Sequence, residues 1–196
     1  SLSEFKAQVG LHTKRIERLF GQTPSVFRNT ELIYNNALAY AAEAMGFSGI
    51  LAEGADHILG WRSPNFVYRP IQAKRIALLL KNYRLSDDVA FRFSSKDWNE
   101  YPLFASKFAQ WISAINGNGE VVNMFMDYET FGEHQWESTG IFDFLRALPG
   151  EILKHPDNTF VTPTEALERY KPVAELDVPH FVSWADTERD LSAWLS

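Results

Sequence analysis

The chain of 196 residues is 45% hydrophobic and 14% aromatic, a composition typical of a globular protein and not of a disordered or fibrous one. Its formal net charge is -6 without a cluster of Lys or Arg, which leaves no electrostatic footprint for nucleic acid, and its apolar runs are too short to span a membrane. The lack of cysteine excludes disulfides and thiolate metal sites and leaves the compartment open, and we expect a cytoplasmic location.

The first part of the chain alternates helical and extended patterns. Apolar residues recur at helical spacing from a cap near Ser3 to Phe20, and Gly21 follows as a helix-ending glycine does. The short run Gly49 to Ala52 leads directly into polar residues, as a buried parallel strand does. We therefore predict helices at 3–20 and 31–45 and strands at 25–28 and 49–52.

The same alternation continues to the end of the chain. Residues 120–126 form the clearest buried strand, and Pro102 and Pro163 stand where helices begin. We predict further strands at 76–81, 88–93 and 120–126, and helices at 102–116, at 138–148 and from Pro163. Short strands that alternate with amphipathic helices indicate an α/β fold with a parallel sheet, in a single domain over 1–196.

The densest group of polar and aromatic residues is MDYETFGEHQW at 126–136, directly after a predicted strand. A carboxylate such as Asp127 at the end of a buried strand is expected to be partly desolvated, which raises its pKa and suits it to donate a proton. The aromatic side chains suit stacking on sugar rings. The alternative is a loop whose acids only cap the helix that begins near Ser138, and composition leaves both interpretations open.

A second group, LAEGADHILGW at 51–61, places Glu53, Asp56 and His57 in the same position relative to its own strand. Most glycosidases use two carboxyl residues on either side of a cleft: one protonates the leaving oxygen, and the other attacks the anomeric carbon or activates water. Ordinary loop acids also form such pairs, so this pattern alone does not select a glycosidase.

The third group, SWADTERDLSAWL at 183–195, is expected to be mainly structural. Asp186 can cap a helix or pair with Arg189 within one turn, and Trp194 can pack. The five His residues are scattered without the spacing of a metal site, so we expect neither a metal nor another cofactor.

MDYETFGEHQW resembles the segment of glycoside hydrolase family 57 α-amylases that carries the catalytic Asp followed by a Phe-Gly pair, and LAEGADHILGW is similar to the segment that carries the nucleophilic Glu. Stretches at 26–36, 85–93 and 183–195 are also similar to the α-amylase branch. The resemblance covers nearly the whole chain. It implies an α/β fold that is part of an incomplete (β/α)7 barrel with parallel strands, with Glu53 as nucleophile and Asp127 as acid/base.

The activity implied by the resemblance is retaining hydrolysis of α-1,4-glucans by double displacement, without a cofactor. The expected partner is an α-glucan or maltooligosaccharide, with no nucleic acid and no membrane. The candidate substrate-binding residues are Arg28, His57, Trp61, Asp87, Glu129, His134, Trp136 and Trp184. We expect Glu53 and Asp127 to face one cleft.

Two departures from the family pattern affect the interpretation. The family's opening His-Gln-Pro segment and its second conserved segment are absent. We therefore interpret the chain as the C-terminal portion of a catalytic barrel, and we expect an exposed apolar edge where the first strands would lie. Ala52 stands where many relatives carry Thr, which alters local hydrogen bonding but leaves the carboxylate of Glu53 in place.

Three other functions fit the same sequence. The chain can belong to a 4-α-glucanotransferase or branching enzyme of the same family, to a non-catalytic carbohydrate-binding relative, or, more distantly, to a metal-dependent deacetylase on a similar barrel. The oligomeric state cannot be read from the residues.

Overall fold

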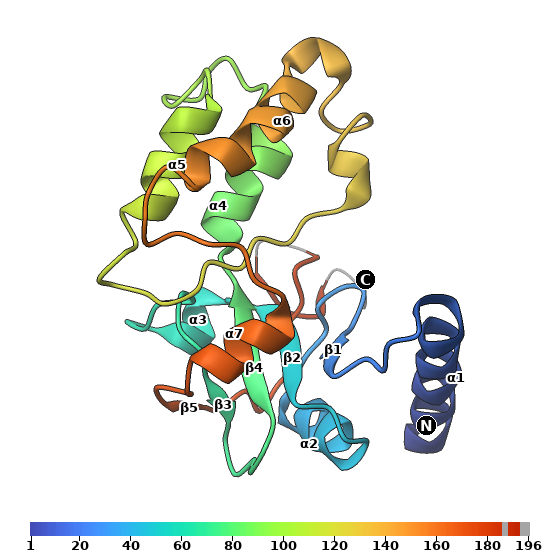
Figure 1. The fold of residues 1–196 in the computed structure, drawn as a ribbon. Helices are drawn as coiled ribbons and strands as arrows, with labels where there is room; N and C mark the ends of the chain where they lie inside the picture. Colours follow the sequence, from blue (N-terminus) through green and yellow to red (C-terminus); the bar gives the residue numbers. More distant parts are fainter. Residues whose placement is uncertain (186–187, 193–196) are drawn as a thin grey trace.

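A small parallel sheet forms the centre of the computed structural model, which describes residues 1–185 and 188–192 (Figure 1). Its strands are β1 (Val26–Arg28), β2 (Gly49–Glu53) and β4 (Ala77–Lys81), in the order β1-β2-β4. All pairs are parallel, so the predicted α/β fold with a parallel sheet is confirmed. A second, very short pair joins β3 (Arg69–Pro70) to β5 (Glu175–Leu176), also in parallel.

Alternate residues of the sheet pack on opposite layers, because successive strand side chains point to opposite faces. Ile50 and Leu80 lie in a core shared with α2 (Asn36–Ala44) and α3 (Asp56–Leu59). Leu51 and Leu79 face the other way, into a core with Ala166 of α7 (Pro163–Arg169). Burial on both faces explains why these strands read as continuous apolar runs in the sequence.

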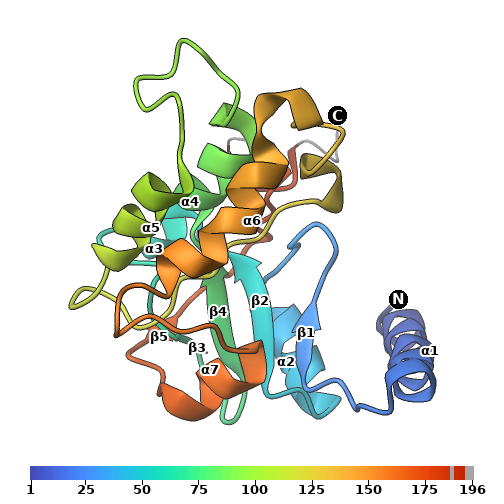
Figure 2. The same cartoon turned by 45° about the horizontal axis from the view of Figure 1, so that its top comes forward.

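A group of helices stands beyond the carboxyl ends of the strands (Figures 1 and 2). It contains α4 (Tyr83–Asp87), the π-helical turn η1 (Asp88–Arg92), α5 (Ala105–Ser113) and α6 (Ile141–Ile152). Phe93, Phe108 and Phe144 meet edge to face in its core, with ring centroids 5.1 and 5.7 Å apart. This helical group and the sheet are therefore held by separate cores, and the edge between them is free to carry polar side chains.

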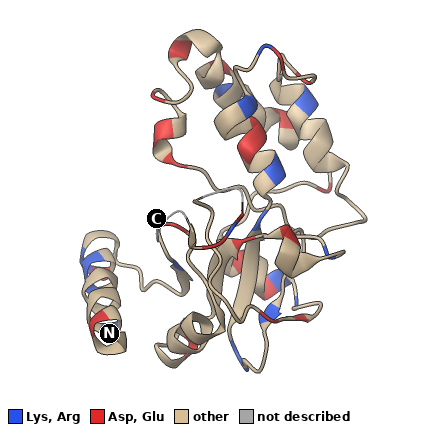
Figure 3. Ribbon diagram, turned by 180° about the vertical axis from the view of Figure 1, so that it is seen from behind, with Lys and Arg blue, Asp and Glu red and all other residues tan. Residues whose placement is uncertain are grey.

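The helix α1 (Leu2–Phe20) stands apart from the rest of the chain in both views (Figures 1 and 2). It buries no residue, and Leu11 and Phe20 are 70% and 68% exposed. Phe5 contacts Phe27 of β1, which pairs only with β2 among the described strands. The expected exposed apolar edge is thus present. No described helix is long and apolar enough to cross a membrane. Acidic and basic residues are dispersed over the ribbon (Figure 3).

The strand predicted at 88–93 is wrong, because these residues continue α4 as η1. Leu85, Val89 and Phe93 recur every four residues and point into the helical core, which is a helical and not an extended pattern. Arg92 donates to the carboxylate of Asp88 at 2.6 Å, an i,i+4 contact that is typical of a helix and that an extended strand does not allow.

The buried strand predicted at 120–126 is also wrong. The segment is extended, but only Asn123 makes a strand-like bridge, to Lys81 of β4, and residues 122–126 are half-buried. Asn82 donates its backbone N–H to Asn123, whereas the N–H of Phe125 goes to the Ser86 hydroxyl. The hydrogen bond to the Ser86 side chain takes the place of a strand-to-strand hydrogen bond with β4. No strand of the described residues pairs with the opposite edge of this segment.

The remaining differences concern where helices begin and end. Ser1, not Ser3, caps α1 by accepting from the N–H of Glu4. The helix predicted at 31–45 begins only at Asn36, because Asn29 holds residues 31–33 in a turn and Leu32 has a positive φ of 52°. The helices predicted at 102–116 and 138–148 are α5 at 105–113 and α6 at 141–152, which continues past Pro149.

Candidate active site

Glu53 ends β2 and lies beside Lys81, which ends β4; the register of the two parallel strands pairs these residues directly. Both follow residues of the same sheet face, Leu51 and Leu79, so their side chains leave the sheet on one side. The side chain of Glu53 has no exposed surface and that of Lys81 is 5% exposed. A carboxylate and an ammonium are therefore buried together at the carboxyl edge of the sheet.

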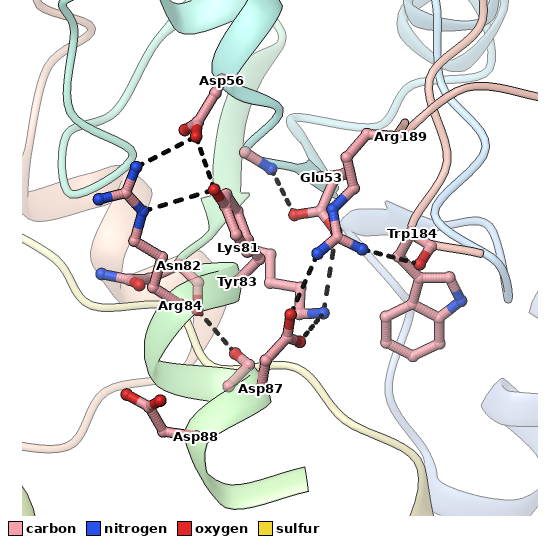
Figure 4. Close-up of polar contacts among 12 residues, drawn as sticks. Glu53, Asp56, Lys81, Asn82, Tyr83, Arg84, Asp87, Asp88, Trp184 and Arg189 are labelled. Carbon is pink, nitrogen blue, oxygen red and sulfur yellow. Dashed lines mark hydrogen bonds and ion pairs between the residues drawn. The ribbon is translucent and has the colours of Figure 1, made fainter. Parts of the chain in front are cut away.

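Four charged side chains form one cluster around Glu53, here called the charge cluster: Glu53, Lys81, Asp87 and Arg189 (Figure 4). The ammonium of Lys81 lies 3.8 Å from Glu53 Oε2 and 3.4 Å from Asp87 Oδ1. Arg189 donates from Nη2 to Asp87 Oδ2 at 3.0 Å, and its Nε lies 3.8 Å from Glu53 Oε2. Two carboxylates and two cations thus balance each other, which buried charges require.

Burial raises the pKa of Glu53, because the protein interior solvates the carboxylate less well than water does. The charges of Lys81 and Arg189 and the N–H of Gly54 oppose this rise, and the charge of Asp87 adds to it. Glu53 Oε1 accepts from Gly54 at 2.8 Å. Oε2 has no hydrogen bond from the described residues, so the cations act on it through charge alone.

A cavity of about 260 Å³ lies beside the charge cluster. Its wall contains the carboxylate residues Glu31, Asp87 and Asp127 and both cations of the cluster. The lining residues are Glu31, Lys81, Asp87, Ala90, Phe91, Phe125, Met126, Asp127, Thr130, His134, Trp184, Ala185 and Arg189. Asp127 therefore shares a cavity with the two side chains that contact Glu53.

The loop that carries Asp127 is shaped by its own backbone. Residues Tyr128–Thr130 form the 3-10 turn η2, and a second such turn, η3 (Glu137–Thr139), leads into α6. The buried Gln135 donates to the carbonyl of Ala90 in the helical group. The partial burial expected for Asp127 is wrong: Asp127 is exposed, because the residues before it form no buried strand. Glu53, in contrast, is fully buried.

The C-terminal segment 182–192 closes one side of the cavity, in its described part. Val182 bridges Tyr34, and Trp184 Nε1 donates to Glu31 Oε2 at 2.8 Å. The charges of Arg28 and Lys81 lie 5.1 and 4.9 Å from the Trp184 ring centroid. The mainly structural role expected for 183–195 is thus incomplete, since this segment supplies side chains to the cavity. Asp186 and Trp194 lie outside the described residues.

The structure brings together only some of the candidate substrate-binding residues. Asp87, His134 and Trp184 line the cavity. Arg28 does not line it but lies over the ring of Trp184. The others are exposed and are not among its lining residues: His57, Trp61, Glu129 and Trp136. Among the described residues no group of three or more His, Asp or Glu is arranged to hold a metal ion.

Sequence reasoning missed Lys81 and Glu31, and it gave Arg189 only a structural role. A signal for Lys81 existed, because it ends the apolar run IALLLK just as Glu53 ends its own strand. Glu31 and Arg189 stand in segments without a strand pattern, and only the three-dimensional fold brings them to the cavity.

Gly54 lies against the backbone of Lys81 in β4, and its replacement tests how tightly this edge is packed. A Cβ added there would clash with the backbone oxygen of Lys81, so we expect Gly54→Ala to lower the free energy of unfolding by about 2 to 3 kcal/mol. Gly150→Ala in α6 is the control, because nothing lies within 4 Å of the added Cβ, and alanine favours a helix. Urea unfolding of both variants is the measurement, and equal stabilities would contradict the packing.

A parallel sheet with helices on both faces and acidic residues beyond its carboxyl edge is an arrangement found in α/β enzymes, both barrels and open sheets. The sequence profile of "Glycosyl hydrolase family 57" matches residues 1–179. The chain therefore belongs to glycoside hydrolase family 57. Over 194 residues it is 53% identical to a Methanocaldococcus jannaschii protein named "Putative alpha-amylase", of which it spans 41% while 98% of this chain is covered.

Solved structures confirm the fold. The chain is similar to a 4-alpha-glucanotransferase from Thermococcus litoralis, with a TM-score of 0.70 at 15% identity over 89% of this chain and 27% of that one. It is also similar to a family 57 branching enzyme from Thermococcus kodakaraensis in complex with glucose, with a TM-score of 0.68 at 16% identity over 97% of this chain and 47% of that one. As expected, the chain has the fold of part of the (β/α)7 barrel of this family.

Proposed function

We propose that the protein cleaves α-1,4-glucans with retention of configuration, with Glu53 as the nucleophile and Asp127 as the acid/base. The observation that supports this assignment most directly is the placement of the two acids. Glu53 is buried beside cations at the edge of the sheet, whereas Asp127 is exposed on the wall of the adjoining cavity. One acid is thus held by neighbouring charges, and the other can exchange protons with water or a sugar hydroxyl.

In the proposed reaction Glu53 Oε2 attacks the anomeric carbon while Asp127 gives its proton to the glycosidic oxygen. A covalent glycosyl ester forms on Glu53, and the bond to the leaving sugar breaks. Asp127 then takes a proton from an incoming water or hydroxyl, which displaces Glu53 from the other face of the sugar. The two inversions together give retention. Asp87, His134 and Trp184 line the cavity and are the residues that we propose to contact the glucan.

Substrate entry requires a movement near Glu53. Its side chain has no exposed surface, and Arg189 lies 3.8 Å from the oxygen that attacks. An anomeric carbon therefore reaches Glu53 only when a neighbouring side chain, such as that of Arg189, moves aside. We propose that the glucan chain in the cavity displaces it.

The protein also aligns with part of a longer relative, and we propose that residues 1–196 form the C-terminal portion of one catalytic barrel domain.

Product analysis separates the proposed hydrolase from a transferase. Maltoheptaose is incubated with the full-length protein, with and without added glucose as acceptor, and the products are followed by proton NMR and chromatography. We expect shorter maltooligosaccharides that are released first as α anomers, with a rate independent of glucose. Products longer than maltoheptaose, or new branch points, would instead indicate a glucanotransferase or a branching enzyme, the activities of the structurally similar proteins. Initial release of β anomers would contradict retention.

Binding without turnover would indicate a non-catalytic carbohydrate-binding protein. Calorimetry with maltoheptaose, performed on the same preparation, distinguishes this outcome from an unfolded or inactive sample. Both carboxyl residues are present, and one of them borders the cavity, which favours the enzyme.

A further inference from the structure

We propose that Lys81 is a positioning residue for Glu53: its ammonium favours the ionised form of the buried carboxylate and holds it at the edge of the sheet, with Asp87 holding the ammonium in place. The catalytic consequence rests on the proposed function, but the electrostatic effect on Glu53 can be measured without any activity.

Strand register places Lys81 for this role. Glu53 and Lys81 are paired neighbours on adjacent parallel strands, on one face and at the same edge. Neither side chain can swing far, because they are 0% and 5% exposed. The ammonium is therefore a fixed neighbour of the carboxylate, and a fixed cation in a poorly solvated place acts more strongly than one on the surface.

Asp87 makes Lys81 a bridge between two carboxylates. Its Oδ1 accepts from the ammonium at 3.4 Å, while its Oδ2 accepts from Arg189 at 3.0 Å. Glu53 Oε2 accepts no hydrogen bond from the described residues. The two neighbouring cations favour the ionised form of this oxygen, and the described residues place no hydrogen-bond donor that would block its attack.

The charged groups facing Glu53 come from three elements. Lys81 comes from β4, Asp87 from α4, and Arg189 from the C-terminal segment. Glu31, Asp127 and His134 stand farther along the cavity wall. Two of the three nearest charges are positive. Without Lys81, the carboxylates of Glu53 and Asp87 have only Arg189 as a neighbouring cation, which should raise the pKa of Glu53. Removing the charge of Asp87 should shift the pKa of Glu53 in the opposite direction, because Glu53 is then the only carboxylate of the cluster that interacts with the two cations.

The test is the titration of Glu53 in the full-length protein labelled with 13C at the glutamate side-chain carboxyl. The Glu53 resonance is assigned by its loss in Glu53→Gln. We expect the titration midpoint to move upward in Lys81→Met, to return close to its original position in Lys81→Arg, and to move downward in Asp87→Asn. Lys107→Met is the matched control, since Lys107 pairs with Glu100 at 2.6 Å and lies against Trp111, away from the cavity. It should leave the midpoint unchanged.

If the proposed function is correct, the acid limb of kcat/KM against pH shifts with the same sign, with about tenfold lower activity on that limb in Lys81→Met. If Lys81 had only a structural role, Lys81→Met would lower activity at all pH values, and the midpoint of the acid limb would not shift. An unmoved Glu53 titration in folded Lys81→Met, or a shift of the same sign in Asp87→Asn, would overturn the inference. Should Lys81→Met fail to fold, Asp87→Asn alone decides it. Shifted titrations in a protein without glycosidase activity would support the inference and contradict the proposed function.

Discussion

Glu53→Ala is expected to reduce turnover of α-1,4-glucans in the full-length protein by about four orders of magnitude or more, because no glycosyl ester can form without the nucleophile. Added azide can occupy the space left by the side chain and attack the anomeric carbon directly. The product is then a glycosyl azide of inverted, β configuration. Proton NMR of the azide product is the measurement.

The control for this variant is Glu151→Ala, which removes a carboxylate from the surface of α6, where it pairs with Lys154. It should keep full activity. Full activity in Glu53→Ala would remove Glu53 from the mechanism, and a retained azide product would mean that another residue still forms the ester.

Asp127→Ala is expected to lower the rate on natural glucans by about 100-fold to 10,000-fold, because the glycosidic oxygen then leaves without a proton. An aryl α-maltoside with an activated leaving group needs little protonation, so it should still form the ester. Azide then attacks the ester and gives a product of retained, α configuration. The ratio of kcat/KM for the aryl glycoside and for maltoheptaose, with the configuration of the azide product, measures this effect.

Asp143→Ala is the matched control, since Asp143 is an exposed aspartate on α6 that pairs with Arg146. It should change neither substrate's rate. If azide gives an inverted product in Asp127→Ala and a retained one in Glu53→Ala, the two roles are exchanged. Equal losses on both substrates would indicate that Asp127 acts in some way other than by donating a proton.

The sequence predicts strands well where both faces are buried in the same way along their length. The runs at 49–52 and 76–80 are uniformly apolar, and they form most of the strands β2 and β4. The run at 88–93 includes Asp88 and Arg92 among its apolar residues, and its apolar pattern begins earlier, at Leu85, so that only a longer window shows the helical spacing. The segment 120–126 has the composition of a strand, yet whether it pairs depends on neighbours that its own residues do not determine.

The candidate site also contains features that local sequence predicts and features that depend on distant residues. Glu53 is recognisable because it ends a buried strand, and its buried position agrees with that signal. Pairing with Lys81 could be read only from the register of two strands, which single-sequence patterns do not fix. Arg189 stands more than a hundred residues beyond Asp87, and no local pattern reports their contact. The sequence therefore indicates which acids end strands but not which cations balance them.

The hydrogen bond between Trp184 and Glu31 joins residues 153 positions apart. In an otherwise unfolded chain, closing so long a loop costs about 4 to 5 kcal/mol of chain entropy, so the contact is favourable only after nearby contacts, such as that of Asn36 with Val178, have brought the two segments together. During synthesis the sheet edge with Glu53 leaves the ribosome long before the segment that covers it. Until the segment that carries Arg189 docks, Glu53 lacks one of its two neighbouring cations, so the charge cluster is complete only when the last part of the described chain folds onto the sheet edge.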